Sequence, residues 1–400
     1  MHSVMALKQS MSILVLSFSH IPTDPRVHKT CQALKSAGFQ VNAVGFESKK
    51  TSPHYDYAYK MLQATPHDMS YRFAMAARQL PAHLMSLCAH KTYWFDQQVK
   101  AMWALIQDEK PQLIYANDLN TLPIAVRLKQ LTGAKLIYDT HEFAVGEGAD
   151  RLIWKLMFQA YRRALEAKNI THVDQVITVS EGIGHALTHM YALQKPVITL
   201  RNVPPYEHVI HRDSRASVRV LYHGLYLKDR GLEALIESVP LWNARFILQL
   251  RGYGAPAYEA YLREYAQKIA PQRIIFEPAV ATHDLVSAAA TADIGVLPFP
   301  TKGIQKEFSL PNKLFEYMMA GLCVITTPCK DISEHLTRYH AGQTTTDASP
   351  QALAQTLNHL TTTQIDQMKS ASLLAAKELN WESEQLKLLQ ILCELHIFAN

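Results

Sequence analysis

Lys313 and Glu316 stand three residues apart in FSLPNKLFEYMMAGLCVITT (308–327). The pattern predicts a helix over 311–320 that Gly321 ends, so both side chains share one side near its amino end. Free N–H groups there attract phosphate, Lys313 adds positive charge, and Glu316 can accept hydrogen bonds from two vicinal hydroxyls. A diphosphate beside a ribose would use all three features. The alternative is an exposed ion pair, which these two residues alone would favour.

Polar residues also follow predicted strands in the first half. Asp118 comes just after QLIYA (112–116), and His141 and Glu142 come after KLIYD (135–139). Parallel sheets bind ligands at the carboxyl ends of their strands, where a histidine can donate to a phosphate or a hydroxyl. A half-buried histidine satisfied by backbone groups is an equal alternative. The two carboxylates form no convincing metal pair.

Asp24 and Pro25 mark the start of a helix just past the first predicted strand. Asp24 suits the N-cap and Pro25 the first helical position, with Arg26 next in the chain. A well-capped helix with no further role is the alternative. The loop SHIPTD (19–24) contains no glycine, and no G-x-G-x-x-G follows, which argues against a nicotinamide or flavin dehydrogenase.

Short apolar runs alternate with helical patterns along the whole chain, which predicts parallel sheets covered by helices. A long helix is expected at 71–107. The predicted strands are 12–18, 40–46, 112–116, 135–139, 175–179 and 197–200 in the first half, and 218–224, 245–254, 273–278, 292–299 and 322–327 in the second. The fold class is therefore α/β, with two doubly wound Rossmann-like domains facing a central cleft that holds the site.

The stretch RNVPPYEHVIHRDSRAS (201–217) loses periodicity and gains prolines and charge, so a domain boundary is expected there. We predict an N-terminal domain at 11–205 and a C-terminal domain at 206–377. The opening run SILVLSF is too short to span a bilayer, and no cleavage site follows it. It is predicted to be a first strand after a short frayed tail, and not a signal peptide.

The composition, with 48% hydrophobic and 19% charged residues, is typical of a soluble globular protein. The net charge of +5 and the pI near 8.8 indicate an anionic partner. Lys and Arg form no stripe interleaved with aromatics, so phosphorylated small molecules and anionic lipid headgroups are favoured over nucleic acid. The five cysteines are scattered, which predicts a reducing cytoplasm and no metal cluster.

Several segments together resemble the retaining glycosyltransferases of family four, which have the two-domain GT-B architecture. In the second half they are HGLYLKDRGLEALIES (223–238), LQLRGYG (248–254), FEPAVATHDLVSAAATADIGVLPF (276–299) and SLPNKLFEYMMAGLCVITT (309–327). In the first half they are TDPRVHKTCQALKSAGFQV (23–41), YANDLNTLP (115–123), YDTHEF (138–143) and VITVSEGI (176–183). ELNWESEQLKLLQILCELH (378–396) is similar to the helix that crosses back onto the first domain in this fold, so 378–400 is expected to do the same.

The resemblance implies a donor-binding set in the second half. Glu316 matches the family's ribose-binding glutamate, and the amides around Ser309 and Leu310 match its phosphate loop. The full predicted set is Glu316, Ser309, Leu310, Asn312, Lys228, Gly224 and Gly252.

The chain departs from the family at two donor positions. Leu225 stands where members tend to have an arginine on the diphosphate, while Arg230 stands where they tend to have a lysine on the diphosphate, directly before the next glycine. Lys228 and Lys313 could supply the missing charge. Phe308 stands where members usually carry a glutamate that contacts the donor sugar.

In the first half His141 matches a histidine that the family often places near the donor diphosphate and the reacting carbon. The predicted catalytic residues are His141, Arg230 and Lys313, and the predicted acceptor-side residues are Asp24, Arg26, Asp118 and Glu142. Members generally hold the diphosphate with helix amides and cations, so no cofactor and no metal ion are expected.

The resemblance implies transfer of a sugar from a nucleotide-sugar donor to a saccharide or lipid-linked acceptor, with retention by front-face attack, in cell-surface polysaccharide or glycolipid synthesis. The main task of such a site is to stabilise the departing diphosphate. Two alternatives stay open: a GT-B protein that binds a nucleotide sugar without catalysis, and a GT-B epimerase that needs no acceptor.

Many aromatic residues lie between Tyr55 and Trp103, and two interpretations of them bear on where the acceptor is met. They could dock the protein on a membrane, or the stretch 83–106 could be a core helix, and apolar helix stripes usually face inward. We expect a cytoplasmic protein with peripheral contact at the inner face of the membrane, and no nucleic-acid partner.

Overall fold

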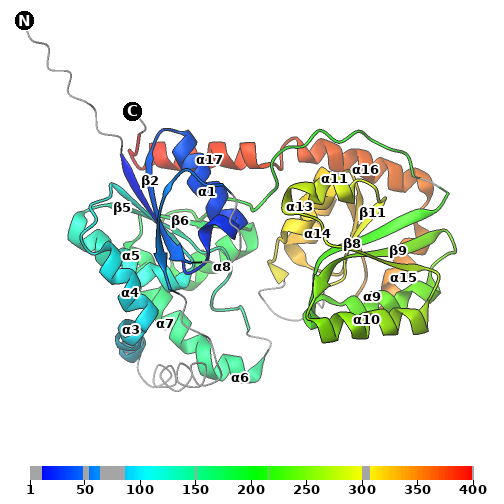
Figure 1. The fold of residues 1–400 in the computed structure, drawn as a ribbon, viewed down its shortest axis with the longest axis horizontal. Helices are drawn as coiled ribbons and strands as arrows, with labels where there is room; N and C mark the ends of the chain where they lie inside the picture. Colours follow the sequence, from blue (N-terminus) through cyan, green and yellow to red (C-terminus); the bar gives the residue numbers. More distant parts are fainter. Residues whose placement is uncertain are drawn as a thin grey trace, which may run out of the picture. The chain divides into compact units, whose positions relative to one another are not determined.

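The computed structural model describes residues 11–47, 54–63, 86–148, 151–214, 216–299 and 307–398. The chain forms two compact units, one of residues 1–200 and 385–400, the other of residues 201–384. Figure 1 shows a sheet flanked by helices in each unit. The boundaries predicted from the sequence were 205/206 and 377/378.

The sheet of the first unit has seven strands in the described part of the chain, in the order β3-β2-β1-β4-β5-β6-β7, all parallel. The strands are β1 (Ser12–Leu16), β2 (Gln40–Phe46), β3 (Ala58–Leu62), β4 (Leu113–Asn117), β5 (Lys135–Asp139), β6 (Gln175–Thr178) and β7 (Ile198–Thr199). The sequence prediction missed β3. This edge strand buries only its last residue, so it has no apolar run to identify it.

Helix α1 begins where local capping predicts. Asp24 is the N-cap of α1, with its side chain accepting from the amides of Arg26 and Val27, and Pro25 is the first helical residue, which confirms the prediction. The main helices are α1 (Pro25–Ser36), α3 (Ser86–Phe95), α4 (Gln97–Ile106), α5 (Leu122–Thr132), α7 (Ala160–Asn169) and α8 (Glu181–Tyr191).

The single long helix predicted at 71–107 is wrong for the part that the structure describes. Asp96 separates α3 from α4: its backbone is extended, and its carboxylate accepts hydrogen bonds from the amides of Gln98 and Val99. The carboxylate caps a new helix and so competes with continuation of the old one. Residues 64–85 lie outside the described residues. The inward-facing interpretation holds for α4, which buries Val99, Met102 and Ile106.

The sheet of the second unit has six described strands in the order β10-β9-β8-β11-β12-β13, again all parallel. The strands are β8 (Val218–Tyr226), β9 (Phe246–Gly254), β10 (Ile274–Glu277), β11 (Ile294–Leu297), β12 (Cys323–Thr326) and β13 (Gly342–Thr344). Strand β13 has three residues and none of them is buried, and the sequence prediction missed it.

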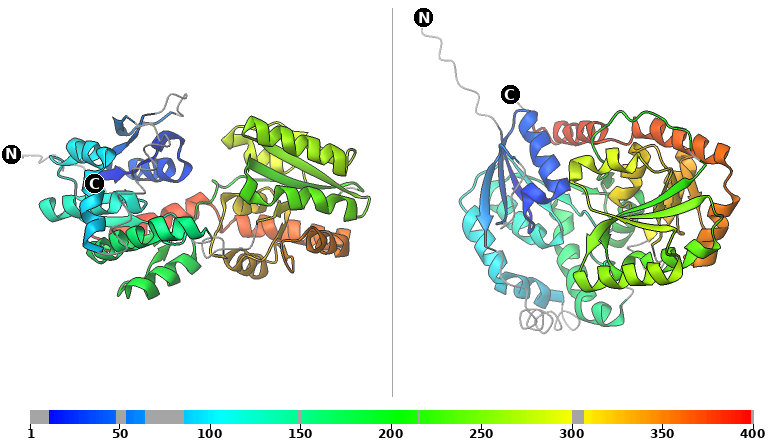
Figure 2. Two further views of the ribbon diagram at one scale, coloured as in Figure 1. Left: turned by 90° about the horizontal axis from the view of Figure 1, so that it is seen from below. Right: turned by 45° about the vertical axis from the view of Figure 1, so that its right-hand side comes forward.

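Helices cover both faces of this second sheet (Figures 1 and 2). One layer contains α9 (Leu232–Ser238), α10 (Pro256–Ile269) and α15 (Pro350–His359), and the other contains α11 (Leu285–Ala289), α13 (Asn312–Met319), α14 (Lys330–Tyr339) and α16 (Thr362–Ala376). Helix α13 follows Pro311 and buries Leu314, Phe315, Met318 and Met319. Strand β12 then returns through the core, as the sequence predicts.

Helix α17 (Trp381–Glu394) begins in the second unit, and its residues from Gln385 onward belong to the first. The fold is therefore two Rossmann-like units with a C-terminal helix that returns to the first, as predicted. Within the described residues, none of the helices combines the length and apolar character that crossing a bilayer requires. All five cysteines lie in the described residues, and none of them forms a disulfide.

Candidate functional site

The carboxyl end of β8 carries a buried histidine that reaches α13. His223 Nε2 donates a hydrogen bond to Glu316 Oε2 at 2.8 Å, and the backbone N–H of His223 donates to the Tyr317 hydroxyl at 3.0 Å. His223 is buried, and Glu316 remains partly exposed. Glu316 is thus fixed through one carboxylate oxygen, and a carboxylate can accept several hydrogen bonds. Its predicted partner, a ribose hydroxyl, could use the remaining capacity.

Lys313 lies over the same strand end. Its Nζ donates to the Tyr222 hydroxyl at 2.8 Å and lies 4.1 Å from the centre of that ring. A Cβ at Gly224 would lie 2.6 Å from Lys313 Cε and 2.9 Å from Nζ, so a larger residue at 224 would displace the end of this lysine. Burial, together with the charge of Arg230, lowers the pKa of Lys313 to about 7, while Glu316 acts to raise it. The charged form of this half-buried amine is therefore disfavoured, in part by the cationic Arg230.

Arg230 ends a short 3-10 helix (Lys228–Arg230) between β8 and α9. Its guanidinium carbon lies 5.6 Å from the centre of the Phe299 ring, and its Nε lies 4.0 Å from Asp229 Oδ1. Neighbouring Lys228 is exposed. The loop thus brings one predicted cation, Arg230, near Lys313, while Lys228 remains at the surface.

The two predicted glycines are partners across the β8–β9 pair. Gly252 stands opposite Gly224, and a Cβ on Gly252 would lie 1.9 Å from the Gly224 carbonyl oxygen. Gly252 therefore permits close approach of the strands, while Gly224 makes room for Lys313. Leu225, at the family's arginine position, is exposed and its side chain carries no charge.

The predicted phosphate loop lies directly before α13. Leu310 is buried and Ser309 is half-buried, and both precede Pro311, the N-cap residue, whose side chain makes no capping hydrogen bond. Asn312 is the first helical residue. An amino end with no side-chain cap has N–H groups that can bind an anion. Phe308 packs near Lys330, whose Nζ lies 5.9 Å from the ring centre.

Sequence reasoning missed three residues of this cluster: Tyr222, His223 and Tyr317. The structure joins His223 to Glu316 across 93 positions of the chain. One signal was available, because a histidine directly before a glycine at a predicted strand end is a polar residue in an apolar run.

The first unit has its own polar cluster at the ends of β4 and β5. His141 Nδ1 lies 3.5 Å from Asp118 Oδ1. Both residues have positive φ, 55° for His141 and 64° for Asp118, in a region that non-glycine residues rarely occupy. Burial acts to lower the pKa of His141, but the Asp118 carboxylate, supported by Asp139, outweighs it and the pKa is raised. His141 is thereby favoured as a hydrogen-bond donor.

A buried ion pair between Arg26 and Asp139 supports this cluster. Arg26 donates two hydrogen bonds to the Asp139 carboxylate, at 2.8 and 2.9 Å, and both side chains are buried. Asp139 also accepts from the Tyr115 hydroxyl at 2.8 Å and from the backbone N–H of His141 at 3.3 Å. Of the predicted acceptor-side residues, Arg26 is therefore buried in an ion pair, and Asp24 acts as a helix cap.

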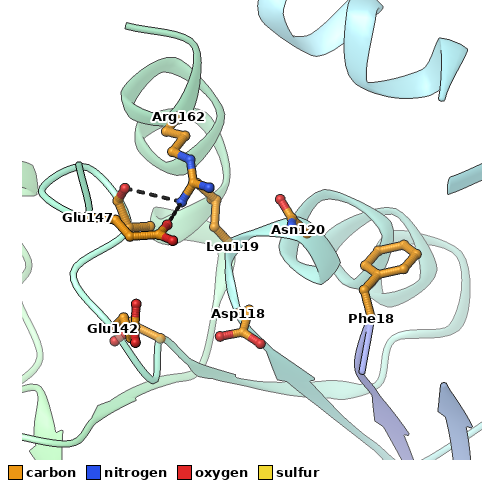
Figure 3. Close-up of a pocket in the computed structure, with 9 residues that line it drawn as sticks. Phe18, Asp118, Leu119, Asn120, Glu142, Glu147 and Arg162 are labelled. Carbon is orange, nitrogen blue, oxygen red and sulfur yellow. Dashed lines mark hydrogen bonds and ion pairs between the residues drawn. The ribbon is translucent and has the colours of Figure 1, made fainter. Parts of the chain in front are cut away.

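A pocket of about 190 Å³ opens next to Asp118 and Glu142 (Figure 3). Burial raises the pKa of Glu142, against the effect of His141. Arg162, which lines the pocket, pairs with Glu147 and also donates to the Ala144 carbonyl at 3.3 Å. The full lining is Phe18, Asp118, Leu119, Asn120, Thr140, Glu142, Ala144, Glu147 and Arg162. The side chains offer many acceptors and few donors, which suits a hydroxyl-rich ligand.

Only one group in the described part of the chain has the spacing of metal ligands: His211, Asp213 and Asp366, on the segment before β8 and on α16. His211 and Asp213 are exposed, and Asp366 accepts hydrogen bonds from the N–H and hydroxyl of Ser214. The predicted donor and acceptor residues are not among them. That glycosyl transfer here needs no metal stays a prediction.

Solved structures with this fold include several glycosyltransferases. Sucrose-phosphate synthase from Thermosynechococcus elongatus superposes with a TM-score of 0.73 and 17% identity over 96% of this chain and 99% of its own. Anabaena HepE in complex with UDP and glucose superposes with a TM-score of 0.68 and 15% identity, over 96% of this chain and 99% of its own. The apo form of the lipopolysaccharide outer core galactosyltransferase WaaB superposes with a TM-score of 0.64 and 11% identity, over 96% of this chain and 99% of its own. The protein therefore has the GT-B architecture.

Family matches cover both units. The family described as Glycosyl transferases group 1 matches residues 217–363, and the Glycosyl transferase 4-like domain matches residues 23–202. No curated protein sequence matches the chain. Together the two matches span most of the chain, which therefore belongs to the glycosyltransferases and is a glycosyltransferase enzyme, as the sequence resemblance implies.

Proposed function

We propose that this enzyme takes its sugar from a nucleotide-sugar donor whose diphosphate binds at the carboxyl end of β8, against the amino end of α13. The observation that carries the proposal is the position of Lys313, a half-buried amine whose pKa is lowered by burial and by the charge of Arg230. Two neighbouring cations repel one another, and an anion placed between them offsets that cost. Glu316, oriented by His223, would then accept hydrogen bonds from the ribose.

The proposed chemistry follows from these charges. When the bond between the anomeric carbon and the diphosphate breaks, negative charge grows on the diphosphate and positive charge on the sugar ring. Lys313, Arg230 and the amides around Ser309, Leu310 and Asn312 would stabilise the leaving group without a protein nucleophile. The proposal includes retention at the anomeric carbon by front-face attack and no metal requirement. HepE, which has a similar fold, has been solved with UDP and with UDP-glucose, so uridine is the first nucleoside to test.

We propose that the acceptor is a saccharide or lipid-linked saccharide that binds in the pocket of the first unit, lined by Asp118 and Glu142. Carboxylates there would accept hydrogen bonds from sugar hydroxyls. His141, whose pKa is raised by Asp118 against the effect of burial, would donate a hydrogen bond in the transfer step. Synthesis of a cell-surface polysaccharide or glycolipid at the inner face of the membrane is the proposed role.

The test begins with a thermal-shift screen against UDP, GDP, ADP and CDP, since a ligand at 100 times its Kd stabilises a protein by about 2.7 kcal/mol. Calorimetry with the selected diphosphate then compares two variants. Arg230→Ala should lose about 1.5–3 kcal/mol of binding free energy, the loss typical of a charged hydrogen bond. Arg263→Ala is the matched control, because its guanidinium also stacks on a phenylalanine, 4.6 Å from the ring centre of Phe276. Equal affinities for both variants would remove Arg230 from the site.

Turnover separates the remaining functions. The nucleotide sugar is incubated with an acceptor panel in EDTA, and products are followed by NMR, which also reports the anomeric configuration. Transfer with retention is expected. Conversion of the donor with no acceptor present would establish an epimerase instead, and binding without any turnover would establish a non-catalytic protein.

A further inference from the structure

The connection between β5 and β6 contains a helix with apolar side chains on its outside. It runs through α6 (Leu152–Trp154) and the π-helical turn η4 (Lys155–Gln159) into α7. In α6 and η4 six of the eight residues are apolar and none is buried. Leu152, Ile153 and Leu156 are 70%, 77% and 57% exposed. Three large neighbouring apolar side chains in solvent indicate an interaction surface.

Several contacts fix one side of this helix against the first unit. The exposed apolar side chains are on the other side and therefore stay in solvent. Gln159 Nε2 donates to the Val145 carbonyl at 3.1 Å, and Arg162 pairs with Glu147. The Trp154 ring packs against Gly148, where a Cβ would lie 2.6 Å from it. One side of the helix is thus used for packing, while Leu152, Ile153 and Leu156 remain outside.

The charged residues of this helix that reach solvent are all positive. Arg151, Lys155, Arg163 and Lys168 are exposed. The single acidic residue in 151–169, Glu166, is buried and accepts hydrogen bonds from the hydroxyls of Tyr138 and Tyr191, at 2.7 and 2.8 Å. Bulky apolar side chains flanked by Lys and Arg are the features that bind a helix to the interface of an anionic bilayer.

We propose that residues 151–168 are an interfacial helix that docks the first unit on an anionic lipid bilayer. Leu152, Ile153 and Leu156 would enter the boundary between headgroups and acyl chains, and the four basic residues would contact the headgroup phosphates. This docking surface is different from the aromatic stretch between Tyr55 and Trp103 that the sequence suggested.

The same helix borders the pocket of the first unit. Arg162, which lines the pocket, follows Leu156 by six positions, or about 9 Å along a helix. Docking would therefore hold the pocket close to the membrane surface, where a lipid-linked acceptor resides. This consequence rests on the proposed function, whereas docking itself does not.

Sedimentation with vesicles tests the docking on the full chain without any nucleotide sugar. The vesicles are pure phosphatidylcholine, or phosphatidylcholine mixed with phosphatidylglycerol. Leu152→Ser/Ile153→Ser is compared with Leu131→Ser/Leu386→Ser, two residues of the same unit that are 66% and 69% exposed. The wild type and the control pair should bind the anionic vesicles alike, and Leu152→Ser/Ile153→Ser should bind them at least about tenfold more weakly.

Charge is tested separately. Arg151→Gln/Lys155→Gln should also weaken binding, and added salt should weaken binding of the wild type. All variants should keep the wild-type melting temperature because the changed side chains are exposed. Three results would overturn the proposal. One is failure of the wild type to bind anionic vesicles, and another is equal binding of both double-serine variants. The third is a wild-type dimer that Leu152→Ser/Ile153→Ser converts to a monomer. Turnover on a water-soluble acceptor does not require docking. The proposed sugar transfer is therefore tested separately from the docking.

Discussion

At the residue scale, Lys313 holds its amine where the charged form is disfavoured. Burial, with Arg230, lowers the pKa of Lys313 to about 7 from the ordinary 10.5, against the opposing effect of Glu316. Between these two pH values the unfolded chain binds more protons than the folded chain, so this group makes the free energy of unfolding rise with pH across that window. A bound diphosphate favours the ammonium form and reverses the preference.

We therefore expect diphosphate binding at about pH 8 to take up about one proton at Lys313. Calorimetry in buffers of different ionisation enthalpy measures this uptake directly, and affinity should fall as the pH rises above 7. Lys313→Met should abolish the uptake, and Lys268→Met, at an exposed lysine of α10, should leave it unchanged. Binding with no proton uptake in the wild type would place the diphosphate away from Lys313.

Glu316 has one carboxylate oxygen on His223 and a partly exposed side chain. If it binds the ribose, Glu316→Gln should lose about 1.5–3 kcal/mol of nucleotide binding, and the 2′-deoxy nucleotide should lose affinity for the wild type but little more for the variant. The exposed carboxylate of Glu264, changed to Gln, provides the control. Additive losses in this cycle would disprove contact between Glu316 and the ribose.

At the element scale, Gly224 near the end of β8 lies directly against the Lys313 side chain of helix α13. Gly224 has φ of 117°, and an added Cβ would collide with Lys313. Gly224→Ala should therefore destabilise the protein by about 1–3 kcal/mol through backbone strain and also weaken diphosphate binding, because Lys313 must move.

Gly133→Ala is the matched control for this change. Gly133 ends α5 with φ of 75°, and nothing lies within 4 Å of a Cβ built there. It should show the loss of stability without any loss of diphosphate affinity. Urea unfolding and calorimetry on both variants make the comparison, and unchanged binding in Gly224→Ala would show that the position of Lys313 is unimportant.

At the scale of the whole molecule, the second unit is one continuous stretch of chain, residues 201–384, whereas the first needs residues 385–400 to be complete. The second unit has its own core, built around residues of β8, β9 and β11 such as Tyr222, Leu248 and Val296. We expect the 201–384 fragment to unfold in one cooperative thermal transition and to bind the nucleoside diphosphate with a Kd within about tenfold of the full chain. A folded fragment that binds none would show that the first unit supplies part of the diphosphate site.

The sequence by itself determined the features that depend on neighbouring residues. The Asp24–Pro25 helix start, the apolar face of α13 and the alternation that builds two parallel sheets were all predicted, because capping and periodicity act within a few positions. Strands β3 and β13 and the break at Asp96 were missed, because the first two have little buried surface and the third depends on a cap in the middle of a helical pattern.

Tertiary structure alone decided how the candidate site is assembled. The sequence placed Lys313 and Glu316 on one side of a helix, but the contacts with Tyr222 and His223, more than ninety positions earlier, exist only because the end of β8 meets α13. The lowered pKa of Lys313 and the raised pKa of His141 have the same origin. Burial and the charge of Arg230 lower the pKa of Lys313, and the Asp118 carboxylate raises the pKa of His141 against burial. A local pattern holds no information about which distant residues a parallel sheet will place side by side.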